Sequence, residues 1–149
     1  GTGLSHACVM RRIVEMGVPI LQIGVRALCL EEDTFRKKHR IPCRDAAIIA
    51  EYGIPPNLVP ASFPKDIYLS FDVDAFDPSV VTATGTPVPG GLSWYQVLLL
   101  LEYVTEGRRV RGFDVVELAP RAHDIASAFA SAQLVYEIMG LVTRSLCVA

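Results

Sequence analysis

The sequence has no long hydrophobic run and no excess of charge of either sign. Its longest apolar run, residues 97–101, is far shorter than the roughly 18 residues that suggest a membrane span. Lys and Arg total 14 against 16 Asp and Glu, and the basic residues are scattered except for a group at residues 36–40. We therefore expect neither a membrane nor a nucleic acid as a partner.

The four cysteines, Cys8, Cys29, Cys43 and Cys147, form no CxxC pair, and the sequence has no secretory leader. This pattern predicts free thiols in a reducing compartment, so we expect a cytoplasmic protein. The 149 residues match the length of one ordinary domain and contain no repeat or linker. The chain begins at Gly1 without a methionine, so we expect residues 1–149 to be a single, partial domain.

Helical and strand patterns alternate along the chain. Helices are predicted at residues 7–16, 30–40, 46–52, 94–104 and 125–139, and strands at 20–25, 66–72 and 110–116. A Ser93–Gln96 capping box opens the fourth helix, and Gly140 is expected to end the fifth. The predicted buried stripe of the fifth helix is Ile125, Ala128, Phe129, Ala132, Val135 and Met139. The alternation is typical of an α/β fold with a parallel sheet.

Acidic side chains follow two of these strands. Asp72 and Asp74 stand two residues apart, so the period of a strand would put both carboxylates on one face. Glu117 follows the strand at 110–116, and ligands of open parallel sheets gather at the carboxyl ends of strands. Carboxylates suit Mg, Ca or Mn, and a pair of such ions activates water for hydrolysis. We predict a divalent metal site at this rim.

Each of these residues also has a plainer interpretation. An aspartate after a strand is common turn chemistry, Glu117 alone could be a surface ion-pair partner, and His6 alone could be an exposed loop histidine. Asp114 lies inside an apolar strand, where a carboxylate needs a donor, and we interpret it as structural. Asp77 is either a turn former or a second-layer residue behind the metal ligands, and we favour the second role.

The stretch SFDVDAFDPSVVTATGTPVPGGLS resembles the signature of the ureohydrolases, the arginase and agmatinase family. The segments GFDVVELAP and LVYEIMG resemble the closing strand and helix of that family, and SHACVMRRIVE with LQIGVR resembles its middle. The resemblance implies an arginase-like three-layer α/β/α sandwich, incomplete at its N-terminal side. It further implies hydrolysis of a guanidino compound, most simply agmatine, by two Mn²⁺ ions, a place in polyamine biosynthesis, and a homo-oligomer.

The same resemblance implies residue roles. Asp72 would bridge the two ions, and Asp74 would ligate one of them. Glu117 would accept hydrogen bonds from the guanidinium group, and His6 would shuttle a proton to the leaving amine or orient the substrate. The family's other ligands come from Gly-Gly-Asp-His and Asp-x-His-x-Asp segments, which this sequence lacks. We therefore expect the chain alone to bind manganese poorly.

Two other hypotheses remain. An apolar strand followed by Asp-Val-Asp also fits the opening motif of aspartyl-nucleophile phosphatases, but Ala75 and Phe76 stand where that chemistry expects a Thr or Val. The second hypothesis is a catalytically inactive relative or fragment that serves as an interaction subunit. The missing metal ligands favour this second alternative.

Overall fold

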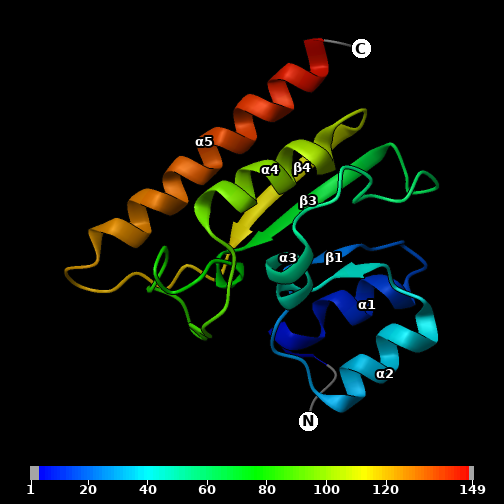
Figure 1. Ribbon diagram of the computed structural model, residues 1–149, viewed down its shortest axis with the longest axis horizontal. Coiled ribbons are helices and arrows are strands. Elements are labelled where there is room, and N and C mark those ends of the chain that lie inside the picture. Colours follow the sequence, from blue (N-terminus) through cyan, green and yellow to red (C-terminus); the bar gives the residue numbers. More distant parts are fainter. Residues whose placement is uncertain (1–3, 148–149) are drawn as a thin grey trace.

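The computed structural model describes residues 4–147, and side chains as far as residue 144 (Figure 1). Gly1 to Gly3, the start of the predicted N-terminal loop, lie outside the described residues. The elements in chain order are η1 (His6–Cys8), α1 (Val9–Glu15), β1 (Gln22–Ile23), α2 (Leu30–His39), β2 (Cys43–Arg44), α3 (Ala46–Tyr52), β3 (Asp66–Asp72), η2 (Val73–Ala75), α4 (Trp94–Thr105), β4 (Arg109–Val116) and α5 (Ile125–Cys147).

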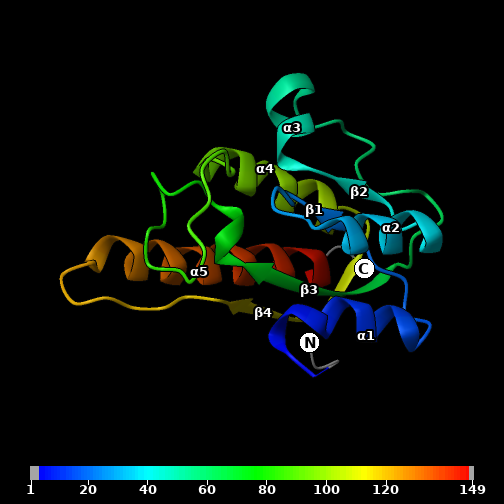
Figure 2. The ribbon, with the colours of Figure 1, turned by 90° about the horizontal axis from the view of Figure 1, so that it is seen from below.

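The strands form two parallel pairs, β1 with β2 and β3 with β4. α5 packs on β4 and on α4, and Figure 2 shows α4 and α1 on opposite sides of the β3–β4 pair. Helices on both sides of parallel strands are the arrangement expected of an α/β sandwich. The predicted fold class is therefore confirmed.

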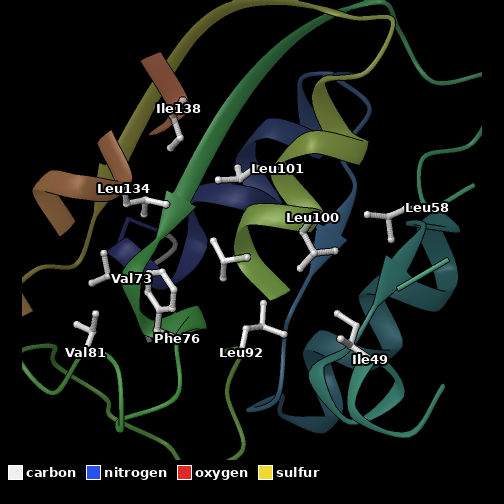
Figure 3. Packing of buried hydrophobic residues seen from close by; sticks show 11 residues of the cluster. Ile49, Leu58, Val73, Phe76, Val81, Leu92, Leu100, Leu101, Leu134 and Ile138 are labelled. Carbon is white, nitrogen blue, oxygen red and sulfur yellow. The ribbon is translucent and has the colours of Figure 1, made fainter. Parts of the chain in front are cut away.

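The hydrophobic core lies between β3, α4 and α5, and the loop that follows β3 contributes to it (Figure 3). Phe76 and Val81 come from this loop and are fully buried beside Leu134 of α5. The Phe76 ring also stacks on Trp94, with ring centroids 5.7 Å apart. Each buried side chain of this size stabilises the fold by about 1.5–3 kcal/mol. The long loop is thus anchored by the core, which fixes the backbone around the predicted acids.

Most element boundaries follow the prediction closely. β3 and α3 have the predicted bounds, and α4 opens on the predicted capping box, in which Ser93 Oγ accepts from Gln96 N and Gln96 Oε1 accepts from Ser93 N. The strand predicted at 20–25 is reduced to β1. It is short because only Gln22 and Ile23 find ladder partners, on β2.

Two predictions about α5 are wrong. The helix does not end at Gly140 but continues to Cys147, because one glycine in a helix costs only about 1 kcal/mol relative to alanine, too little to end it. The buried residues of α5 are Ser127, Ser131, Leu134 and Ile138. In the predicted stripe, Ile125 is 79% exposed and Phe129 is 70% exposed. Both faces of this helix carry apolar or small residues, so periodicity alone could not choose between them.

By length and composition alone, α5 is also apolar enough to cross a membrane, with a mean hydropathy of 1.5 over Ile125–Arg144 and 22% of that window buried. Core helices of globular domains pass the same test. Since α5 packs on α4 and β4, we interpret it as a helix of the domain.

Cys29 and Cys43 are free thiols, as predicted, and Cys8 Sγ lies 3.4 Å from Ser5 Oγ. The side chain of Cys147 lies outside the described part of the chain.

Candidate functional site

Asp72 ends β3, and the chain turns at once into η2, which holds Asp74. Asp72 Oδ1 accepts a hydrogen bond of 2.8 Å from the backbone N–H of Asp74. The two carboxylates therefore meet across a turn rather than along one strand face, which corrects the argument from strand period. A single acidic residue at the end of the strand both caps the turn and positions the next acid.

The carboxylate of Asp74 has one satisfied and one unsatisfied oxygen. Oδ2 accepts a short hydrogen bond from Thr86 Oγ1, which comes from the loop after β3. Oδ1 is buried and has no hydrogen-bond partner among the described residues. A buried carboxylate oxygen without a donor is costly and rare in folded proteins. A cation at this point would remove that cost.

The pKa of Asp72 reflects its burial and the charges of two neighbouring acids. Burial of the group raises the pKa of Asp72, and repulsion from Asp74 and Glu117 raises it further, although the hydrogen bond from Asp74 N and the charge of Arg26 oppose the shift. The residue itself is nevertheless exposed to solvent. The charges of the three strand-end acids are thus close enough to repel one another, and their meeting as one metal site stays a prediction.

Glu117 occupies an unusual backbone position. It follows β4 with a φ of 64°, a left-handed conformation that few residues with a side chain adopt. The neighbouring backbone is fixed by a bridge between Thr84 and Leu118 and by a 2.8 Å hydrogen bond from Ala119 N to Ala83 O. Such strain persists where surrounding contacts impose it, and it is typical of functional sites.

Asp77 holds the two ends of the loop together. Its carboxylate accepts hydrogen bonds from the hydroxyl and N–H of Ser79 and from the N–H groups of Gly90 and Gly91. These donors, led by Ser79, lower the pKa of Asp77 to about 2. A Cβ on Gly91 would lie 2.4 Å from Asp77 N, so only glycine fits there. No hydrogen bond joins Asp77 to Asp72 or Asp74 among the described residues, and its second-layer role stays a prediction.

The sequence reasoning missed Arg26. Its Nε donates to Val88 O at 2.8 Å, its Nη2 donates to Phe76 O at 3.3 Å, and its charge lowers the pKa of Asp72. Arg26 therefore ties the loop to the segment after β1 and places a positive charge near the acids. Its position just beyond a strand's carboxyl end was the signal that could have identified it.

The remaining predicted residues are less well connected. His6 begins η1, and no hydrogen bond in the described part of the chain joins it to the three acids. Within residues 4–144, whose side chains the structure describes, no three His, Cys, Asp or Glu side chains are grouped so that they could hold a metal ion. The donor set therefore fits a metal centre only in part. Asp72 and Asp74 provide carboxylates, one with an unpartnered oxygen, and further ligands would have to come from elsewhere.

Comparison with known proteins identifies what this arrangement is similar to. A sequence model of the arginase family matches residues 1–140. The N(1)-aminopropylagmatine ureohydrolase of Synechocystis sp. is 39% identical over 141 residues, which cover 94% of this chain and 46% of that protein. The agmatinase of Pyrococcus horikoshii is 37% identical over 146 residues, which cover 97% of this chain and 50% of that protein.

Solved structures give the same result. Proclavaminate amidino hydrolase from Streptomyces clavuligerus superposes with a TM-score of 0.84 and 26% identity, over 94% of this chain and 50% of that one. The agmatine ureohydrolase of Thermoplasma volcanium gives a TM-score of 0.83 and 27% identity, over 96% and 49%. The expected arginase-like fold is confirmed, and the chain spans about half the length of the proteins that it matches.

Proposed function

The chain belongs to the arginase family, and on this basis we propose that it supplies part of the active site of a manganese-dependent ureohydrolase that splits agmatine into urea and an amine. The observation that carries the proposal is the buried Oδ1 of Asp74, which has no hydrogen-bond partner among the described residues and lies in the turn that Asp72 caps at the carboxyl end of β3. Both aspartates belong to the stretch that resembles the signature of the family. This geometry fits a hydrolase of the family better than it fits a phosphatase that uses Asp72 as nucleophile.

Two carboxylates of this chain would hold the metal. The two ligands would be Asp72, which lies near the charges of two other acids, and Asp74, whose buried Oδ1 has no hydrogen-bond partner among the described residues. When bound, Mn²⁺ would supply Lewis acidity and lower the pKa of water at the rim. The pair is only part of a ligand set, so the activity belongs to a protein that also contains the remaining ligands.

The substrate's guanidinium group would bind Glu117. A planar fork of N–H donors pairs well with a carboxylate, and the charge of Glu117 is near enough to Asp72 to raise the pKa of that residue. His6 would donate a proton to the leaving nitrogen, since an amine leaves poorly as an anion. Agmatine is the proposed substrate because relatives at 37–39% identity are named for agmatine or aminopropylagmatine.

The test is an Asp72→Asn variant, made in the protein expressed at the full length of its reading frame. Urea release from agmatine in the presence of Mn²⁺ should fall by about 100-fold or more, since even residues behind metal ligands commonly cost 10–100-fold. Asp66→Asn is a matched control at the opposite end of β3, where Asp66 pairs with Arg109. Unchanged urea release in Asp72→Asn would refute the assignment of Asp72.

A second candidate is a catalytically inactive relative that acts as an interaction subunit. The lack of a three-residue metal group among the side chains of residues 4–144 favours it. The reading frame upstream of Gly1 separates the two candidates. Gly-Gly-Asp-His and Asp-x-His-x-Asp segments there would complete an enzyme, whereas a start codon directly before Gly1 would favour the inactive subunit. Cytoplasmic location and homo-oligomer formation stay predictions.

A further inference from the structure

The pairing of β3 with β4 determines which way Asp72 points. The register shifts between Ile67 and Tyr68, and beyond that irregularity Tyr68 lies opposite Gly112, Ser70 opposite Asp114, and Asp72 opposite Val116. These three pairs share one face of the sheet, because side chains alternate along a strand. A slip of one residue would move a whole set of side chains to the other face.

A tyrosine ring and a glycine lock the first of these pairs. A Cβ on Gly112 would lie 3.0 Å from Cε2 and 3.2 Å from Cδ2 of Tyr68, so the ring lies directly over the glycine. The ring then reaches the next pair, where Tyr68 Oη donates to Asp114 Oδ2 at 2.9 Å. This contact also raises the pKa of Tyr68, because the hydrogen bond to the carboxylate stabilises the protonated phenol.

The second carboxylate oxygen of Asp114 is also occupied. Ser70 Oγ donates to Oδ1 at 2.7 Å, so one carboxylate on β4 holds two hydroxyl groups on β3. We call Tyr68, Ser70, Gly112 and Asp114 the Asp114 clamp. It ends two residues before Asp72 on one strand and three before Glu117 on the other. The donors that Asp114 was expected to need are therefore present.

The clamp discriminates between registers, which the backbone ladder by itself does not do. A one-residue slip would place Asp114 on the face of Leu69 and Phe71, which pack against the core. A carboxylate without donors in that position is strongly unfavourable. In the observed register, Asp72 also lies on the face of the sheet opposite to Leu69 and Phe71.

We propose that the Asp114 clamp sets the β3–β4 register and thereby fixes the position of Asp72 relative to Glu117. Tyr68, Ser70 and Asp114 are then positioning residues of the site. The catalytic consequence rests on the proposed ureohydrolase function, whereas the effect on register does not. The experiment therefore measures the strand register and the catalytic activity separately.

The register is read by NMR on the isotope-labelled 149-residue chain without metal. Wild type should give one set of cross-strand contacts that joins Ser70 to Asp114 and Asp72 to Val116. In the double variant Tyr68→Phe/Ser70→Ala, which removes both donors and keeps the ring over Gly112, these contacts should weaken or split into two sets. The single variants Tyr68→Phe and Ser70→Ala give the same readout if the double variant does not fold.

Matched controls separate register from general stability. Arg109→Gln removes the paired hydrogen bonds to Asp66, both 2.8 Å, which join the same two strands before the register shift. It should leave the contacts of Asp72 with Val116 unchanged. Ser70→Thr retains the hydroxyl group, so this variant should keep the cross-strand contacts that the donor-free variants lose. Unchanged cross-strand contacts in the donor-free variants would overturn the proposal.

The consequence for activity is measured on the full-length protein. The double variant should lower kcat for agmatine by about 10–100-fold with a smaller change in KM, as expected when reacting groups are misplaced by about 1 Å. Wild-type kcat in a variant whose register has changed would overturn the positioning role. Failure of the wild-type protein to release urea would refute the proposed function. The NMR measurement would still decide whether the Asp114 clamp sets the β3–β4 register.

Discussion

Individual side chains hold the loop between β3 and α4 in place, and Asp77 makes the most contacts among them. Four hydrogen bonds from Ser79, Gly90 and Gly91 reach its carboxylate, so the ionised form is the form that closes the loop. The loop carries Thr86, which binds Asp74. The protonation state of Asp77 should therefore affect both stability and the shape of the site.

This leads to a prediction on acid stability. The pKa of Asp77 is lowered from its ordinary 3.8 to about 2 in the folded chain, so its contribution to stability is present above pH 4 and is lost as the pH falls toward 2. In Asp77→Asn, the urea concentration at the midpoint of unfolding should be lower than in wild type at pH 7. It should also fall less steeply than in wild type between pH 4 and pH 2. Glu106→Gln, at an exposed position outside the loop, is the control. Parallel pH curves for wild type and Asp77→Asn would contradict the prediction.

Sequence reasoning identified the acids of the site but not the groups that hold them. Asp72 and Glu117 could be found because each follows a predicted strand, and strand ends of a parallel sheet meet at one edge. The contacts that Arg26 and Thr86 make could not be predicted, even though Arg26 also lies just beyond a strand end, because these contacts join residues 50–62 and 12 positions apart in irregular backbone. No local pattern encodes where a loop closes. The turn that holds Asp74 was not predicted for the same reason.

At the scale of elements, local sequence signals predicted the boundaries correctly where they favoured one structure clearly over the alternatives. The capping box fixed the start of α4, and the apolar run bounded by Lys65 and Asp74 gave β3 its bounds. α5 is different, because small and apolar residues lie on both of its faces. Its orientation is decided by packing of Leu134 and Ile138 in the core, which involves β3 and α4 and is not visible in the helix itself.

A pair of alanine substitutions tests the orientation of α5. Leu134 is fully buried, so Leu134→Ala should lower the free energy of unfolding by about 2–5 kcal/mol. Phe129 was predicted to be buried and is 70% exposed, so Phe129→Ala should change it by only about 0.5 kcal/mol. Urea denaturation of the two variants gives both values. A larger loss for Phe129→Ala than for Leu134→Ala would mean that the other face of the helix is buried.

At the scale of the whole molecule, the chain has an organised rim and an incomplete ligand set. The core that holds β3, α4, α5 and the loop does not depend on a metal ion, because its buried members are apolar side chains packed on one another. We propose two carboxylates of the rim as metal ligands, and no group of three metal-binding side chains exists among the side chains described, at residues 4–144. Folding and metal binding should therefore be separable in this chain.

This separation can be measured directly. The 149-residue chain should bind Mn²⁺ with a dissociation constant of roughly 0.1–1 mM, as weak cation sites do, and Asp72→Asn should weaken binding further. Electron paramagnetic resonance of free Mn²⁺ gives the constant. Far-UV circular dichroism and the melting temperature should be the same with and without EDTA, because the core forms without the ion. Submicromolar binding by the chain, or a fold that EDTA disrupts, would show that the missing ligands are supplied within the chain or by a second copy.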